Sequence, residues 1–228
     1  MTETHVNLAA FLPRSRVNGP GLRSVLWVQG CPFRCAGCFN PDFLPFDGGQ
    51  TVSVAAAAGL LLAEADTEGV SFSGGEPFAQ ARALAAVAAQ VKAAGKGVLI
   101  FTGYEVDILR QSRNPAIRAL WAQADALVAG PYRADLPGRE PLRSSANQQW
   151  VSLTDRYQGV DLGPRRAEFR IGPGGQVTVT GFPPPPQPAT PPSLHSPLGE
   201  RGISPFSPTE KGGDEGMKKC ACHASRHP

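Results

Sequence analysis

Three cysteines, Cys31, Cys35 and Cys38, lie close together in the segment GCPFRCAGCFNP with the spacing CxxxCxxC. Cysteine thiolates are soft ligands that bind zinc or iron–sulfur clusters. A structural zinc site normally has four ligands, and this segment offers neither a fourth cysteine nor a histidine. A [4Fe-4S] cluster held by three thiolates keeps one iron open to an outside ligand, which favours catalysis over electron transfer. A zinc site completed by a distant residue, and three unrelated structural cysteines, remain as alternatives.

The residues around the cysteines favour a tight loop that a cofactor can approach closely. Pro32 and Pro41 restrict the backbone, and Gly37 removes a side chain beside Cys38. The preceding segment, residues 23–29, is apolar and rich enough in β-branched residues to form a buried strand that runs into the loop. The loop is therefore predicted at the carboxyl end of a strand.

A second group of residues that could take part in chemistry is Ser73-Gly74-Gly75-Glu76-Pro77, at the end of the next predicted strand, residues 70–73. Two glycines expose backbone groups at a strand end, and the Glu76 carboxylate can accept hydrogen bonds from a bound ammonium group. Pro77 is well placed to begin a helix. Taken alone, the segment is typical of an ordinary turn, and it gains weight from its position behind the cysteine loop.

Strands and helices alternate through the first 182 residues. Helices are predicted over residues 54–65, with Thr51 or Ser53 as the cap, and over 79–94, 104–110 and 116–122; further strands are predicted at 97–101 and 126–129. Two strands joined by Gly-Pro-Gly-Gly, at 168–171 and 177–180, predict a hairpin. This alternation indicates an α/β fold with a mostly parallel sheet, whose strand carboxyl ends carry the chemistry.

Composition limits the possible classes of protein. The chain has 22 Lys and Arg against 19 Asp and Glu without a basic patch, so we expect no nucleic-acid partner. The longest apolar run, Val54 to Ala63, has about half the length that a membrane-spanning helix needs. We therefore expect a protein that does not cross a membrane. The N-terminus has no charged region followed by an apolar one, which argues against secretion and predicts a cytoplasmic location. Five cysteines in a reducing compartment favour metal or redox chemistry over disulfides.

The composition changes near Gly181. Residues 183–228 hold 11 of the 23 prolines and show no apolar periodicity, which predicts a disordered tail after a domain formed by residues 1–182. Cys220 and Cys222 lie in this tail, and we assign them no function because no core would hold metal ligands in place.

The CxxxCxxC loop and the GGE segment together resemble the radical S-adenosylmethionine (SAM) superfamily. The resemblance implies a partial (β/α) barrel, a [4Fe-4S] cluster and SAM as cofactors, and reductive cleavage of SAM to a 5′-deoxyadenosyl radical. It assigns cluster binding and catalysis to Cys31, Cys35 and Cys38. It assigns SAM binding to a second set of residues: Gly37, Cys38, Phe39, Gly74, Gly75 and Glu76.

Within that superfamily, the chain resembles the anaerobic ribonucleotide reductase activating proteins over roughly residues 11–160. The segments that carry this resemblance are NGPGLR at 18–23, CAGCFNP at 35–41, TGY at 102–104, GPY at 130–132 and RSSANQ at 143–148. Ala129 replaces an acidic residue usual in the family, and Ser144 replaces a glycine. Tyr104, Asn147 and Gln148 have an alternative structural interpretation, in which they pack on the sheet or cap a turn.

The resemblance implies that the protein generates a glycyl radical on anaerobic ribonucleoside-triphosphate reductase or another glycyl-radical protein. A low-potential electron donor of the flavodoxin or ferredoxin type would supply the electron. Two alternatives remain open. One is a radical SAM enzyme acting on a small molecule, similar to 7-carboxy-7-deazaguanine synthase, and the other is a non-catalytic Fe-S or zinc module.

Overall fold

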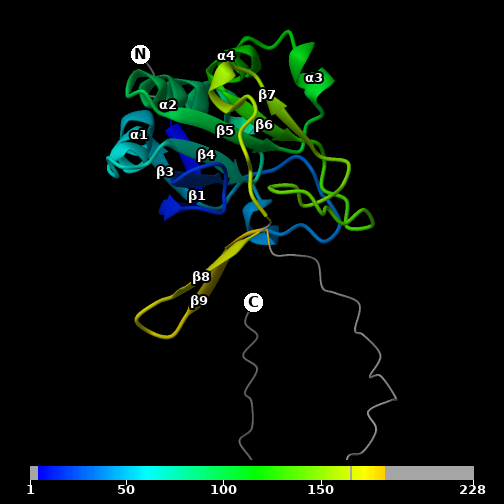
Figure 1. Cartoon of the computed structure of the whole chain (residues 1–228). Coiled ribbons are helices and arrows are strands. Elements are labelled where there is room, and N and C mark those ends of the chain that lie inside the picture. Colours follow the sequence, from blue (N-terminus) through cyan, green and yellow to red (C-terminus); the bar gives the residue numbers. More distant parts are fainter. Residues whose placement is uncertain (1–4, 165, 183–228) are drawn as a thin grey trace, which may run out of the picture. The chain divides into compact units, whose positions relative to one another are not determined.

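The computed structural model describes residues 5–164 and 166–182, which form a seven-stranded sheet, helices and a separate two-stranded hairpin (Figure 1). The strands of the large sheet are β1 (His5–Ser15), β2 (Arg23–Val28), β3 (Gln50–Ser53), β4 (Gly69–Gly74), β5 (Gly97–Thr102), β6 (Ala126–Ala129) and β7 (Gln149–Ser152). The α-helices are α1 (Val54–Leu62), α2 (Ala81–Ala93), α3 (Val106–Arg110) and α4 (Pro115–Gln123). Three short 3-10 helices are η1 (Pro41–Phe43), η2 (Pro77–Gln80) and η3 (Asp155–Tyr157), and the hairpin is formed by β8 (Ala167–Ile171) and β9 (Val177–Gly181).

The strand order in the sheet is β3-β1-β2-β4-β5-β6-β7. The central strands β2, β4, β5 and β6 are parallel, whereas β1, β3 and β7 pair antiparallel to their neighbours. The mixed α/β class and the parallel centre of the sheet are therefore confirmed. The order ends at β3 and β7 without closure between them in the part of the chain described, so the partial barrel remains a prediction.

The predicted elements correspond closely to β2, β4, β5, β6, the four α-helices and the hairpin. Ser53 is the cap of α1, because its Oγ accepts a hydrogen bond from the backbone N of Ala56 at 3.1 Å. The helix predicted from residue 79 begins as η2 at Pro77 and continues as α2. The antiparallel strands β1, β3 and β7 were not predicted.

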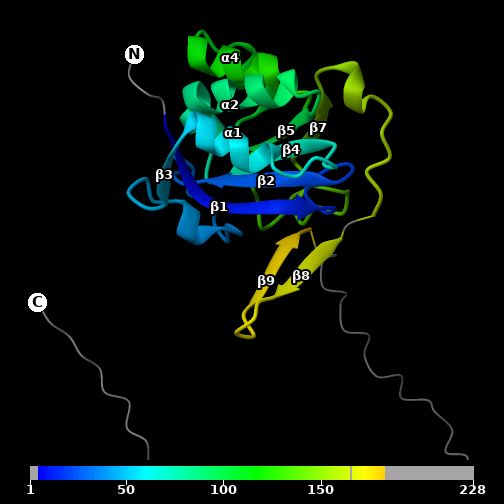
Figure 2. The same cartoon turned by 90° about the vertical axis from the view of Figure 1, so that its left-hand side faces the viewer.

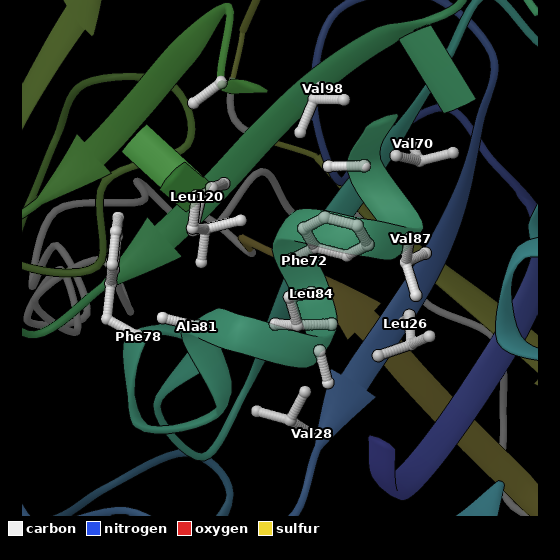
Figure 3. Close-up of a cluster of buried hydrophobic side chains, with 14 of the residues drawn as sticks. Leu26, Val28, Val70, Phe72, Phe78, Ala81, Leu84, Val87, Val98 and Leu120 are labelled. Carbon is white, nitrogen blue, oxygen red and sulfur yellow. The ribbon is translucent and has the colours of Figure 1, made fainter. Parts of the chain in front are cut away.

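One face of the sheet is covered by α1, α2 and α4 (Figure 2). The core there is built from alternate residues of the central strands, such as Leu26 and Phe72, packed against Leu84 and Val87 of α2 (Figure 3). All four of these side chains have no exposed surface. Burying one such side chain contributes about 1.5–3 kcal/mol to folding, so this layer fixes the positions of the parallel strands.

The opposite face of the sheet is covered by irregular chain. Leu99 and Val128 project to this side and pack with Leu142, which lies between β6 and β7, and with Tyr157 of η3. Because strand side chains alternate between faces, Trp27 and Phe101 also point away from the helices. This face carries the candidate site.

None of the described helices combines the length and apolar character needed to cross a membrane. The predicted tail at residues 183–228, including Cys220 and Cys222, lies outside the described residues.

Candidate functional site

A cavity of about 480 Å³ lies at the carboxyl ends of the parallel strands, on the sheet face opposite the helices. Its wall includes residues from each of the segments that the sequence singled out: Cys31, Cys35, Cys38, Phe39, Gly74, Gly75, Glu76, Thr102, Gly103, Gly130, Tyr132, Ser144 and Gln148. Of the predicted site residues, only Gly37 does not line the cavity. The fold therefore brings together segments that are more than one hundred residues apart in the sequence.

The three thiols belong to the loop that follows β2. Cys31, Cys35 and Cys38 are half-buried and form no disulfide. The backbone N of Cys38 donates to the carbonyl O of Cys35 at 3.2 Å, which makes a tight turn between them. Gly37 has φ +71°, a left-handed conformation that side chains other than glycine adopt at a cost. The loop thus depends on glycine at this position for its backbone path.

Hydrogen bonds hold the segment after the cysteines, residues 42–45, against the residues at the start of the loop, Gln29 and Cys31. The backbone N of Cys31 donates to the carbonyl O of Leu44 at 3.0 Å. The side-chain amide of the buried Gln29 donates to the carbonyl oxygens of Asp42 (3.0 Å) and Pro45 (2.7 Å). Gln29 was not among the predicted site residues, since a lone glutamine at a strand end belongs to no recognisable motif.

Gly74, the last residue of β4, and Gly75 pack directly against the end of β2 and the start of the cysteine loop. The backbone N of Gly75 donates to Val28 O at 2.7 Å, and that of Glu76 donates to Gly30 O at 2.9 Å. A Cβ on Gly75 would lie 2.3 Å from Gly30 O. The expectation that the glycines expose backbone groups at the strand end is wrong for Gly75, whose N–H, like that of Glu76, already has a backbone partner. The glycines allow close contact between β4 and the cysteine loop.

Glu76 is 1% exposed and its carboxylate accepts three hydrogen bonds. Oε1 accepts from the backbone N of Phe78 (2.9 Å) and from Thr102 Oγ1 (2.8 Å), and Oε2 accepts from the backbone N of Gly103 (2.8 Å). Burial raises the pKa of Glu76 to about 7, against the lowering effect of these hydrogen bonds. The carboxylate thus ties the end of β4 to the end of β5, and these three hydrogen bonds use three of its four acceptor directions.

Aromatic pairs join the cysteine loop to the two neighbouring strand ends. Phe33 makes an edge-to-face contact with Tyr104, with ring centroids 4.8 Å apart, and Phe39 packs on Tyr132 at 5.0 Å. Such pairs contribute about 0.5–1.5 kcal/mol beyond the area they bury. Tyr104 and Tyr132 therefore have a packing role in holding the loop against the sheet.

The segment 143–148 holds the turn after β6. Gln148 Oε1 accepts from the backbone N of Ser144 (2.8 Å) and Ser145 (3.2 Å), and its Nε2 donates to Gly130 O at 3.1 Å. Asn147 Nδ2 donates to Pro131 O at 2.7 Å. The structural interpretation of these two residues is confirmed, because both brace the turn that forms one wall of the cavity.

The donor set of the cavity fits a cluster better than a single metal ion. Among residues 5–164 and 166–182, no three His, Cys, Asp or Glu side chains converge on one point that could hold a metal ion. Each thiolate of a [4Fe-4S] cluster binds a different iron, so such convergence is not required. Burial raises the pKa of the Cys31 thiol to about 11, and metal binding must therefore displace its proton.

The cavity wall also contains residues that the sequence analysis did not identify. Trp27 and Phe101 contribute aromatic surface, and Arg170 and Thr178 reach the wall from the hairpin. Alternation along β2 and β5 could have placed the two aromatic residues on this face. The hairpin residues gave no such signal, because their position depends on tertiary contacts.

Comparison with known proteins agrees with these findings. A family model described as a 4Fe-4S single cluster domain matches residues 17–151. This chain belongs to that 4Fe-4S single-cluster family. The match spans every cavity-lining segment from β2 to β7 and ends before the hairpin.

The curated relatives carry the name anaerobic ribonucleoside-triphosphate reductase-activating protein. The relative from Enterobacteria phage T4 is 30% identical over 156 residues, covering 66% of this chain and 96% of the relative. That from Vibrio cholerae is 33% identical over 154 residues, and that from Escherichia coli K12 is 29% identical over 152; each match covers 63% of this chain and 96% of the relative. These coverages show that the chain contains nearly the whole length of these activating proteins.

Proposed function

We propose that the protein is a radical SAM activase that generates a glycyl radical on anaerobic ribonucleoside-triphosphate reductase. The observation that carries this proposal is the single cavity that collects the cysteine loop, the GGE segment and the TGY, GPY and RSSANQ segments. The 4Fe-4S family match and the activating-protein relatives support it. Residues 1–182 would form the catalytic domain.

In this proposal, Cys31, Cys35 and Cys38 hold a [4Fe-4S] cluster with one iron open to SAM. When bound and reduced by a flavodoxin- or ferredoxin-type donor, the cluster supplies the electron that cleaves SAM to methionine and a 5′-deoxyadenosyl radical. The residues of the chain bind and orient the cofactors and shield them from water.

The roles of the remaining residues follow from their positions. Gly74, Gly75 and Glu76 form the wall beside the thiols, where the free acceptor direction of the Glu76 carboxylate can receive the ammonium group of SAM. Phe39 is 62% exposed at the cavity wall and offers an aromatic surface to a nucleoside. Gly37 keeps the loop in the conformation that presents Cys38.

The direct test is anaerobic incubation of reconstituted protein with dithionite and SAM, followed by an assay for 5′-deoxyadenosine. We expect 5′-deoxyadenosine from the wild type and none from Cys31→Ala, because loss of one thiolate disrupts the cluster. Cys220→Ala is the matched control, and it should retain both iron and product formation. Absence of product from iron-replete wild type would contradict the proposal.

A second assay separates the activase from other radical SAM enzymes. When the reductase is added, we expect an EPR signal from a glycyl radical on that protein. Formation of 5′-deoxyadenosine without any radical on the reductase would support cleavage of SAM and contradict the activase assignment. That outcome would favour a small-molecule substrate instead.

A further inference from the structure

The hairpin formed by β8 and β9 has one apolar face that no described residue covers. Phe169 pairs with Val179 and Ile171 pairs with Val177 across the two strands, so these four side chains share one face. Their exposed fractions are 70%, 51%, 76% and 60%, respectively. We call this set of residues the hairpin apolar face.

The other face of the hairpin is polar and anchored. Glu168 Oε1 accepts from the backbone N of Arg16 at 2.8 Å, and Thr180 Oγ1 accepts from Asn18 Nδ2 at 2.9 Å. Arg170 donates to the carbonyl O of Arg14. The orientation of the hairpin is therefore fixed by polar contacts, and its apolar face is left toward solvent.

The hairpin apolar face is continuous with the candidate active site. Arg170, Thr178 and Thr180 line the cavity from the polar face, and Val179 belongs both to the cavity wall and to the apolar face. At the base of the hairpin, Phe182 stacks on Phe101 of β5 with ring centroids 5.6 Å apart. Val179 is therefore the member of the apolar face that joins it to the cavity wall.

An isolated two-stranded hairpin is only marginally stable in water, and contiguous exposed apolar surface commonly marks a protein interface. The hairpin also lies beyond residues 17–151, the segment matched by the 4Fe-4S single-cluster family. It is thus an element added beside the shared site.

We infer that the hairpin apolar face docks the protein substrate whose glycine enters the cavity. This inference rests on the proposed function. A cavity of about 480 Å³ admits only a few residues of a folded partner, whereas a specific interface buries roughly 800 Å² on each side. The partner must therefore also contact surface around the cavity, and the hairpin apolar face is exposed apolar surface that adjoins the cavity wall at Val179.

The test compares Phe169→Ser and Ile171→Ser with wild type, using the anaerobic ribonucleoside-triphosphate reductase of the same organism as substrate. Both residues lie outside the cavity wall. We expect the reductase concentration for half-maximal glycyl-radical formation to rise roughly tenfold, as for loss of an interface anchor. Formation of 5′-deoxyadenosine without reductase should remain at the wild-type rate.

Matched variants separate docking from folding. Ile108 of α3 is 58% exposed and does not line the cavity, so Ile108→Ser should leave the half-maximal concentration unchanged. Phe169→Leu keeps an apolar side chain and should recover most of the loss. Circular dichroism and the melting temperature of each variant should match the wild type.

An unchanged half-maximal concentration in both hairpin variants would overturn the inference while the proposed function stands. A wild-type dimer that the variants dissociate, seen by sedimentation, would likewise overturn it and identify a second copy as the occupant. If the wild type forms no radical on the reductase at any concentration, the proposed function fails, and this inference fails with it.

Discussion

Glu76 has a structural role in addition to the ligand-binding role that its sequence motif suggested. Its motif predicted an acceptor for a ligand ammonium, and the structure shows a buried carboxylate that already accepts from Phe78, Thr102 and Gly103. A ligand contact would therefore use a side chain that is fixed in advance by protein donors. Such preorganisation reduces the cost of orienting the carboxylate when the ligand binds.

Replacing Glu76 by Ala removes the acceptor and leaves the Thr102 hydroxyl and the backbone N–H groups of Phe78 and Gly103 without their partner. We expect a loss of about 1–3 kcal/mol in the free energy of unfolding and weaker SAM binding, with the iron content unchanged. Urea denaturation and equilibrium dialysis with SAM measure the two effects. Unchanged stability together with unchanged SAM affinity would contradict both roles.

Thr102→Val separates the two roles, because valine keeps the shape of threonine and leaves the Glu76 carboxylate in place. The substitution removes one donor to Glu76 and the acceptor of the Tyr104 N–H. A smaller loss, about 0.5–1.5 kcal/mol in the free energy of unfolding, is expected. If SAM affinity falls as far in Thr102→Val as in Glu76→Ala, the carboxylate acts through its position rather than by direct contact.

Residues with a characteristic spacing were predictable, and residues without one were not. The cysteines and Glu76 stood out because few other functions need those residue types at that spacing. Gln29 gave no signal, since it acts through the carbonyl oxygens of a distant loop. Alternation along β2 could assign Trp27 to a face of the sheet, but not to the wall of a cavity. Such roles exist only once the chain has folded.

The end of β4 and the cysteine loop form one unit, because backbone hydrogen bonds join residues 28–30 to Gly75 and Glu76. Gly75→Ala would place a Cβ 2.3 Å from the carbonyl O of Gly30. Since that atom belongs to the backbone, the loop itself must move. We expect Gly75→Ala to lower the iron content after reconstitution and to destabilise the fold by roughly 1–3 kcal/mol.

Gly59 offers the matched control for this substitution. It lies within α1, and a Cβ there would meet nothing within 4 Å. Gly59→Ala should leave the iron content unchanged and raise the free energy of unfolding by about 0.5–1 kcal/mol. Iron analysis and denaturation of both variants make the comparison, and equal iron content in the two would contradict the proposed contact.

The elements with clear periodicity were predicted, and the antiparallel strands were not. β3 and β7 have four residues each, too few to show an alternating pattern, and they lie at the sheet edges. β1 is long, but its pairing with β2 shifts register twice, near Ala10 and near Ser15, and it contains Pro13. Its pattern of buried residues is therefore irregular, and only pairing with β2 and β3 defines it.

A buried carboxylate network lies at the end of the sheet opposite the cavity. The cavity is at the carboxyl ends of the parallel strands, whereas Asp125 is buried where β6 begins. Its carboxylate accepts from Lys92 Nζ (2.5 Å), Thr154 Oγ1 (2.8 Å) and the backbone N of Val98 (2.8 Å). This network connects α2, β5 and the segment after β7.

The carboxylate of Asp125 makes stability depend on pH. Burial acts to raise its pKa, but the hydrogen bonds from Lys92, Val98 and Thr154 prevail and lower it. A carboxyl group whose pKa is lower in the folded state than in the unfolded state contributes its full stabilisation of the fold above its unfolded pKa of about 4. This contribution disappears as the pH falls through the folded-state pKa. We therefore expect the free energy of unfolding to decline below about pH 4.

Asp125→Asn should make the free energy of unfolding less dependent on pH in the acid range. It should also lower that free energy near neutral pH, because Lys92 loses its charged partner. Asp107→Asn is the control, because Asp107 is exposed and its ion pair with Arg110 contributes little. Chemical denaturation across the acid range tests both variants. An equally steep decline in Asp125→Asn and in the wild type would contradict the role of Asp125.

The most direct test of the whole account is the EPR spectrum of the anaerobically reduced protein, recorded with and without SAM. If Cys31, Cys35 and Cys38 hold a [4Fe-4S] cluster with one iron open, the signal must appear in the wild type and change when SAM is added. A signal that SAM leaves unaltered, or a protein that holds zinc at full occupancy and no iron, would contradict the account.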